Sequence, residues 1–239
     1  YKEDIFLLDK LFQLRSIRNQ PTLLVKSDIE ELHGKVVVVF GGTYGIGQEI
    51  CEICREYKTT LYVYSRSTGV DVSNSQSVRR VLSEIYEKEG RIDWIVNTAG
   101  ILDKQPLANM SYEVVHRSID INYLGNIIVA KESFSYLKES KGSLLFFTSS
   151  SYTRGRALYS LYSSSKAAIV NFVQALSEEW FEYDIRVNCI NPERTKTPMR
   201  IQNFGNEPED TLLEPKVVAI VSVNTLLSEM TGEVVDVKR

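Results

Sequence analysis

The sequence contains few cysteines and no long hydrophobic run. Cys51, Cys54 and Cys189 make an odd number among 239 residues, which argues against a disulfide framework and predicts a reducing, cytoplasmic location. No apolar stretch approaches the roughly 20 residues of a membrane span, and no signal peptide is visible. The sequence therefore predicts a chain that works in water, without a membrane partner.

An excess of basic residues is also lacking. The 28 Lys and Arg are outnumbered by 31 Asp and Glu, and the formal net charge is −3. Such a balance provides no general attraction to nucleic acid or to an anionic membrane. The length fits one α/β domain with a substantial core.

A pattern typical of metal sites is incomplete. Cys51 and Cys54 form a CxxC pair, which in other settings indicates redox or zinc chemistry. This stretch predicts a helix with Ile50, Ile53 and Cys54 on its apolar side, so packing is the favoured interpretation. No second cysteine pair or nearby histidine completes a zinc site, and we expect no metal.

A glycine-rich segment follows the first predicted strand. Residues 35–40 form a nearly continuous β-branched run, typical of a strand buried on both faces of a parallel sheet. The segment 41–47, GGTYGIG, then leads into a predicted helix. Strand, glycine loop and helix together favour dinucleotide binding, with the phosphates at the helix N-terminus. The alternative is a structural glycine turn.

Each glycine of this segment has an expected task. Gly41 allows the tight turn, Gly45 lets the backbone approach a pyrophosphate, and Gly47 lets the helix pack on the strand.

Strands and helices alternate along the rest of the chain, which predicts an α/β fold with a parallel sheet. Further strands are expected at residues 60–65, 92–96, 143–148, 185–190 and 232–237. Helices are expected at about residues 48–57, 74–88, 111–139, 158–183 and 215–228, the second of them capped by Ser73 or Asn74.

The end of the second predicted strand indicates the cofactor. Arg66 and Ser67 stand where an acidic residue would bind the ribose hydroxyls of NAD. A cation with neighbouring hydroxyls suits the additional phosphate of NADP. The sequence therefore predicts NADPH as the cofactor.

The strongest catalytic candidate is a tyrosine–lysine pair. Tyr162 and Lys166 are four residues apart, so a helix would place both on one face, one turn apart. A fixed ammonium stabilises a phenolate, and the pKa of Tyr162 is predicted to fall from about 10 towards working pH. Such a phenol suits proton transfer in a carbonyl–alcohol interconversion. Ser149 offers a hydroxyl to the same oxygen. The alternative is an exposed helix with an ordinary Tyr/Lys pair.

From about residue 32 to residue 238, the sequence resembles the short-chain dehydrogenase/reductase family. The motifs that carry the resemblance occur in the family's order: GGTYGIG at 41–47, NTAG at 97–100, Ser149, and YSSSK at 162–166. The resemblance implies a single Rossmann-type, doubly wound parallel sheet of about seven strands with helices on both faces. It also implies a homo-oligomer, a dimer or tetramer, paired through the two long helices.

The resemblance further implies individual roles. Tyr162 would be the acid and base, Lys166 would lower its pKa and bind the nicotinamide ribose, and Ser149 would hold the substrate oxygen. Asn122 would support a water in the proton relay. The residues implied to bind the cofactor are Gly41, Thr43, Tyr44, Gly45, Ile46, Gly47, Ser65, Arg66, Ser67, Asp71, Val72, Asn97, Ala99, Gly100, Tyr162, Lys166, Pro192, Thr195 and Thr197.

Three residues depart from the family pattern. Phe40 stands where Thr is usual, and Glu193 replaces the usual Gly after Pro192. Tyr44 stands where many NADP-dependent members have a basic residue, so the NADP prediction depends mainly on Arg66.

The N-terminal segment suggests a second activity. The amphipathic residues 1–16 resemble the C-terminal helix of sugar-phosphate cytidylyltransferases, 17–31 are predicted to be a linker, and 32–239 form the reductase domain. Because the chain begins with Tyr1, we expect a processed chain or a piece of a longer one. The arrangement resembles bifunctional enzymes that join a ribulose 5-phosphate reductase to a CDP-ribitol pyrophosphorylase in bacterial capsule synthesis. It implies a cytidylyltransferase domain in the same polypeptide; a simple helical extension is the alternative.

These observations predict NADPH-dependent reduction of ribulose 5-phosphate to ribitol 5-phosphate. Five cations follow the carboxyl ends of strands, where such sheets bind ligands: Arg154, Arg156, Arg194, Lys196 and Arg200. The first four are expected to hold the sugar phosphate. A 3-oxoacyl thioester reductase of the same family is one alternative. A non-catalytic nucleotide-binding sensor is another.

Overall fold

The computed structural model describes residues 32–239, and the predictions for 1–16 and 17–31 lie outside them. A six-stranded sheet forms the centre, in the order β2-β1-β3-β4-β5-β6, and every neighbouring pair is parallel. The strands are β1 (Val36–Phe40), β2 (Thr60–Tyr64), β3 (Trp94–Asn97), β4 (Ser143–Phe147), β5 (Arg186–Pro192) and β6 (Val234–Val237). This arrangement confirms the predicted α/β class.

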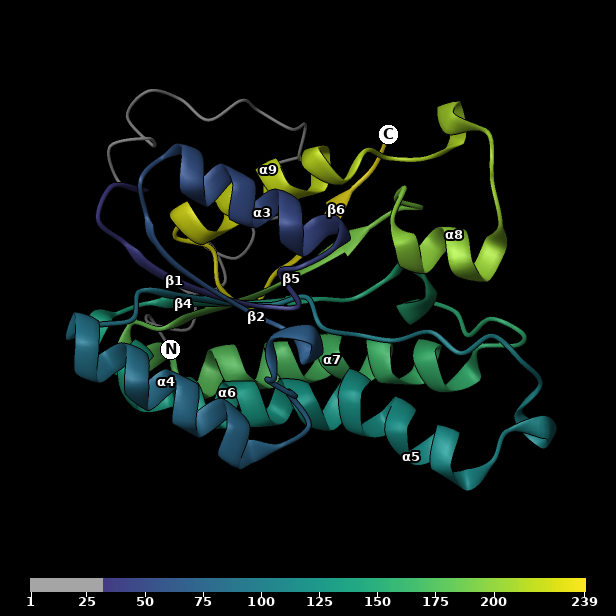
Figure 1. The fold of residues 1–239 in the computed structure, drawn as a ribbon, viewed down its shortest axis with the longest axis horizontal. Helices are drawn as coiled ribbons and strands as arrows, with labels where there is room; N and C mark the ends of the chain where they lie inside the picture. The colour runs from purple at the N-terminus through teal and green to yellow at the C-terminus, as the bar shows by residue number, and fades with distance from the viewer. Residues whose placement is uncertain (1–31) are drawn as a thin grey trace, which may run out of the picture.

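Helices cover both faces of the sheet (Figure 1). The helices on one face are α4 (Ser75–Glu89), α5 (Tyr112–Ile119), α6 (Gly125–Ser140) and α7 (Ser160–Glu179), while α3 (Gly45–Glu56) and α9 (Pro215–Leu227) lie on the other. A short helix, α8 (Pro198–Phe204), stands beyond the carboxyl end of β5. Within residues 32–239, no helix combines the length and apolarity needed to cross a membrane.

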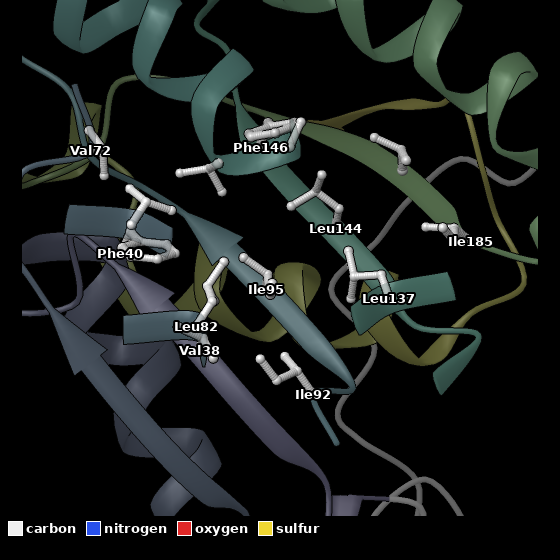
Figure 2. Close-up of a cluster of buried hydrophobic side chains, with 14 of the residues drawn as sticks. Val38, Phe40, Val72, Leu82, Ile92, Ile95, Leu137, Leu144, Phe146 and Ile185 are labelled. Atoms are coloured by element: carbon white, nitrogen blue, oxygen red, sulfur yellow. The ribbon is translucent and has the colours of Figure 1, made fainter. Parts of the chain in front are cut away.

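Strand β1 shows why its sequence is continuously apolar. All five of its residues are buried. Val36, Val38 and Phe40 belong to the core beneath α4, α6 and α7, whereas Val37 and Val39 belong to the core beneath α3 and α9. Side chains alternate between the faces of a strand, so a strand covered on both faces needs apolar residues at every position. Figure 2 shows the first of these cores.

The sheet has six strands in the described residues, where the family resemblance implied about seven. Between Tyr64 and Ser75 the chain makes only a 3-10 turn, Arg66–Thr68, and further turns. A crossover between parallel strands needs a dozen or more residues. This connection is too short for another parallel strand, and β2 forms the edge of the sheet.

Two helical predictions need correction. Residues 111–139 form two helices, α5 and α6, joined by a π-helical turn at Asp120–Leu124. The side-chain amide of Asn126, in the first turn of α6, donates to the backbone oxygen of Asn122 in this turn at 2.8 Å. Helix α8 was not predicted, because seven residues are too few to show a helical period. Its Thr197 cap and first-turn proline were the only local signal.

The cap of α4 was one of two alternatives. The side chain of Asn74 accepts hydrogen bonds from the backbone amides of Gln76 and Ser77, at 3.0 and 3.1 Å. Asn74, rather than Ser73, therefore caps the helix.

The Cys51–Cys54 pair packs in the apolar core. Both thiols are free and lie on the buried face of α3. Burial raises the pKa of Cys51 to about 12 and that of Cys54 to about 11, which disfavours the reactive thiolate. Among residues 32–239, no cluster of three potential His, Cys, Asp or Glu ligands is found.

We expect Leu144→Ala to lower the free energy of unfolding by about 2–5 kcal/mol, since it leaves a cavity at the centre of β4. Leu144 is 0% exposed. The control is Leu107→Ala at a residue 55% exposed, for which a change within about 0.5 kcal/mol is expected. Urea unfolding followed by circular dichroism measures both; equal effects would contradict the assigned core.

Candidate active site

A cleft of about 650 Å³ opens where the parallel strands end. Gly41 lines it after β1, Thr98 after β3, Ser149 after β4, and Pro192 at the end of β5. From β1 the chain first adds β2 on one side and then β3 on the other. The cleft lies at this switch point, where open α/β sheets bind ligands.

The glycine loop forms one wall of the cleft. Gly41 has φ +80°, and a Cβ there would lie 2.6 Å from the backbone nitrogen of Ala99. A Cβ on Gly47 would lie 2.5 Å from the carbonyl oxygen of Gly41. Both positions therefore require glycine, which brings the start of α3 close to the strand ends.

The start of α3 fits a phosphate group. Its N-cap residue, Tyr44, makes no side-chain capping bond, and its first turn has no acidic residue. Gly45, Ile46 and Gly47, at the beginning of this helix, line the cleft. An uncapped helix N-terminus carries partial positive charge and free backbone donors, so the residues present suit a dinucleotide pyrophosphate.

The far end of the cleft contains the residues predicted to select NADP. Ser65, Arg66 and Ser67 line it, and the two serine hydroxyls lie 2.7 Å apart. Asp71 also lines the cleft, where its carboxylate accepts bonds from the amide and hydroxyl of Ser73 at 2.9 and 2.7 Å.

The catalytic candidates come together at the opposite end. Helix α7 carries Tyr162 and Lys166, and Ser149 follows β4; all three line the cleft. The ammonium of Lys166 lies 5.4 Å from the centroid of the Tyr162 ring. The Ser149 hydroxyl is hydrogen-bonded to Tyr162. This arrangement can present a phenol and a hydroxyl to one carbonyl oxygen.

The predicted fall in the pKa of Tyr162 is wrong for this structure. Burial, the largest effect, raises the pKa of Tyr162 to about 12, because a phenolate removed from water loses its hydration. The hydrogen bond with Ser149 and the charge of Arg200 lower the pKa, but by less. The Lys166 ammonium is instead directed at the carbonyl oxygen of Phe147, 2.8 Å away.

Burial also governs Lys166 itself. Its side chain belongs to a residue only 5% exposed, and burial lowers its pKa to about 8. Burial therefore favours the neutral form of both groups: the protonated phenol of Tyr162 and the uncharged amine of Lys166.

Two predicted asparagines lie behind the wall of the cleft. Asn122 is fully buried; its side chain donates to the carbonyl oxygen of Ile101 and accepts from its amide, each at 2.9 Å. Asn97 donates to Asn126 at 2.9 Å and accepts from the amide of Ala99 at 3.2 Å. Both hold the backbone that lines the cleft. Val72, Ala99, Gly100, Thr43, Thr195 and Thr197 line the cleft directly.

Of the four cations predicted to hold a phosphate, only one lines the cleft. Arg194 lines the cleft. Arg154 and Arg156 are exposed outside the lining, and Lys196 pairs with Glu209.

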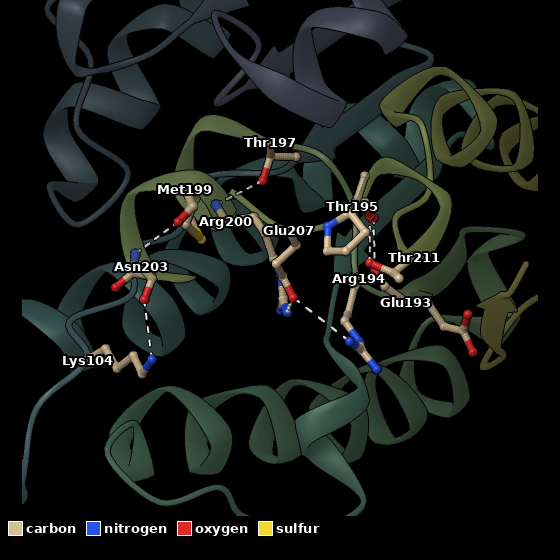
Figure 3. Close-up of polar contacts among 11 residues, drawn as sticks. Lys104, Glu193, Arg194, Thr195, Thr197, Met199, Arg200, Asn203, Glu207 and Thr211 are labelled. Atoms are coloured by element: carbon tan, nitrogen blue, oxygen red, sulfur yellow. Dashed lines mark hydrogen bonds and ion pairs between the residues drawn. The ribbon is translucent and has the colours of Figure 1, made fainter. Parts of the chain in front are cut away.

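One cation of the lining, Arg117 on α5, was not predicted. Arg200 on α8 was noted among the cations after the same strand as Arg194, but not among those expected to hold the phosphate, and it also lines the cleft. Arg200 stands in the same basic segment as Arg194 (Figure 3), which was the available signal. The direction of each side chain depends on α5 and α8, whose placement no local pattern reveals.

We expect the stability of the parent chain, relative to Lys166→Met, to rise with pH between about pH 8 and pH 10. In this window the folded Lys166 has released a proton that the unfolded chain still binds, so raising the pH favours the folded state. Urea unfolding of both proteins across this range measures the difference. A flat or falling difference would show that Lys166 keeps its ordinary pKa.

Several known proteins are similar to this chain in sequence. One is the "Bifunctional ribulose 5-phosphate reductase/CDP-ribitol pyrophosphorylase Bcs1" of Haemophilus influenzae, 49% identical over 98% of this chain and 49% of that protein. The chain thus spans about half of this relative's length. Another is an acetoacetyl-CoA reductase of Acinetobacter, 32% identical over 69% of this chain and 76% of that protein.

Solved structures share the fold. The crystal structure of Cj0485 dehydrogenase has a TM-score of 0.79 at 23% identity, covering 87% of this chain and 94% of that one. A 3-ketoacyl-(acyl-carrier-protein) reductase from Brucella melitensis has a TM-score of 0.79 at 21% identity, covering 86% and 97%. The model of the family described as short chain dehydrogenase matches residues 67–208. Together with the cleft and its tyrosine–lysine pair, this match shows that the chain belongs to the short chain dehydrogenase family.

Proposed function

We propose that this chain reduces ribulose 5-phosphate to ribitol 5-phosphate with NADPH. The observation that carries the proposal is the 49% identity, over 98% of this chain, with the bifunctional protein of Haemophilus influenzae. The product would feed CDP-ribitol synthesis for a bacterial capsule polysaccharide. The cytidylyltransferase that consumes it would be a domain of the same polypeptide or a separate chain.

The family implies a nicotinamide cofactor, NAD or NADP. The glycine loop and the start of α3 would hold its pyrophosphate, and Arg66 with Ser65 and Ser67 would select the additional phosphate of NADP. When bound, the reduced nicotinamide supplies a hydride for a carbonyl carbon. Lys166 lines the same cleft and would bind the nicotinamide ribose.

The residues of this chain would supply the proton. The raised pKa of Tyr162 keeps its phenol protonated at neutral pH, which is the form that reduction of a ketone requires. Ser149 would hold the ketone oxygen while Tyr162 donates its proton to it. The oxygen gains one proton and the carbon one hydride, and the ketone becomes a secondary alcohol.

A second candidate is a 3-oxoacyl thioester reductase. The 32% identity to the acetoacetyl-CoA reductase of Acinetobacter favours it. The cations Arg194 and Arg200 at the substrate end of the cleft fit a small phosphorylated sugar better than an apolar acyl chain.

One assay tests the proposed function. The protein is mixed with NADPH and either ribulose 5-phosphate, ribulose or acetoacetyl-CoA, and the absorbance of the reduced nicotinamide is followed. We expect ribulose 5-phosphate to be reduced with the highest kcat/KM. Preference for acetoacetyl-CoA would establish the second candidate, and no turnover with any of them would contradict both.

Tyr162→Phe is expected to lower kcat by about 100-fold or more, because it removes only the transferable proton. NADPH binding, measured by fluorescence titration, should stay within about twofold, since the ring remains in place. The control is Tyr112→Phe, at a residue 83% exposed on α5. A kcat close to that of the parent would exclude Tyr162 as the acid.

Arg66→Ala is expected to weaken NADPH binding by about tenfold or more, as for a lost charge-assisted hydrogen bond, and to leave NADH almost unchanged. Arg80→Ala is the matched control, since Arg80 is an exposed arginine of α4 that pairs with Glu84. Equal losses for the two cofactors, or equal use of both by the parent, would refute the selection of NADP by Arg66.

A further inference from the structure

Two arginines of the cleft share one carboxylate. The Nε and Nη2 atoms of Arg200 donate to Glu207 at 2.6 and 2.9 Å, and Nη1 of Arg194 lies 3.8 Å from the same carboxylate (Figure 3). The hydrogen bonds from Arg200, and to a lesser extent the charges of Arg200, Arg194 and Lys104, hold the pKa of Glu207 below its usual range. The group formed by Arg194, Arg200 and Glu207 thus carries one net positive charge.

Besides Glu207, an aromatic ring and the cap of α8 also position Arg200. Its guanidinium lies 4.1 Å from the centroid of the Phe204 ring, one turn further along α8, and its backbone amide donates to Thr197 at the helix cap. On the same ring, the ammonium of Lys104 lies 4.4 Å from the centroid. Cation–π stacking of this kind positions a guanidinium without an ion pair. Arg200 can therefore face the cleft when Glu207 moves away.

Arg200 lies close to the candidate catalytic phenol. The ring of Tyr159 contacts Tyr162 at 6.4 Å and Phe204 at 6.0 Å between centroids, both edge to face. The charge of Arg200 also lowers the pKa of Tyr162. A small molecule whose carbonyl meets Tyr162 can thus extend along Tyr159 to reach Arg200.

We propose that Arg200 and Arg194 bind the phosphate of the substrate, and that the Glu207 carboxylate occupies this site while phosphate is absent. The assignment rests on the proposed function for the identity of the sugar. A phosphate monoester carries a charge of about −1.5 to −2 and three acceptor oxygens, against the single charge and two oxygens of a carboxylate. It therefore competes for two guanidinium groups that a single carboxylate only partly neutralises.

The test measures phosphate binding separately from turnover. Inorganic phosphate is titrated calorimetrically into the parent, Arg200→Met, Arg200→Lys and Glu207→Gln, with NADP bound and without it. We expect Arg200→Met to weaken phosphate by about 10-fold or more, the equivalent of a lost charge-assisted hydrogen bond. Arg200→Lys should give an intermediate loss of phosphate affinity, because it keeps the charge but not the two parallel hydrogen bonds of a guanidinium. Glu207→Gln should tighten binding, since the competing carboxylate is gone.

Matched controls come from the same molecule. Lys196→Met removes a cation of the same segment, paired with Glu209 and outside the cleft lining, and should leave phosphate binding unchanged. Arg66→Ala should also leave phosphate binding unchanged; if it weakens binding, the phosphate is held at the cofactor site. Weakening by Arg66→Ala but not by Arg200→Met would overturn the proposal, as would a Glu207→Gln variant that binds phosphate no better than the parent.

Kinetics then connects this site to the sugar. Arg200→Met should raise the KM for ribulose 5-phosphate by about 10-fold or more and change the KM for ribulose much less. Equal increases for both sugars would mean that Arg200 only supports α8, and would overturn the assignment. A parent that binds phosphate through Arg200 but reduces neither sugar would refute the proposed function and leave the anion site supported.

Discussion

Two reciprocal hydrogen bonds between β4 and α7 hold the candidate active site together. The Thr148 hydroxyl donates to the backbone oxygen of Lys166 at 2.8 Å, and the Lys166 ammonium donates to the backbone oxygen of Phe147 at 2.8 Å. They join the helix that carries Tyr162 to the strand end that carries Ser149. Because both bonds are buried, breaking either leaves an unpaired polar group away from water, which costs more than an exposed bond.

The same burial determines the charge state of the site. It raises the pKa of Tyr162 and lowers that of Lys166. The neutral forms of both groups are therefore more populated than they would be for the same pair in water. The sequence-based prediction counted the attraction between the two groups and omitted the loss of hydration. In this structure the second effect is larger, since the ammonium is turned towards Phe147. For a reductase, the outcome is favourable, because a protonated phenol is the form that donates.

Much of the fold was predictable from local patterns. The apolar run of β1 and the alternation of strands and helices predicted a parallel sheet. The prediction was incomplete where the backbone conformation depends on contacts between residues far apart in the sequence. The π-helical turn at Asp120–Leu124 accompanies the bonds of Asn122 to Ile101, twenty-one residues away. Helix α8, with seven residues, is too short to show a helical period.

By itself, the sequence determined which residue types could serve a dinucleotide and a carbonyl: the glycine loop, Arg66, Ser149, Tyr162 and Lys166 were recognisable as candidates, and the structure brings all of them to one cleft. Only the tertiary structure decided which cations face the cleft. Arg154, Arg156 and Lys196 point elsewhere, whereas Arg200 joins Arg194 around Glu207. The physical reason is that spacing along one helix or loop reports local neighbours, while burial and side-chain direction are set by the packing of elements far apart in the chain.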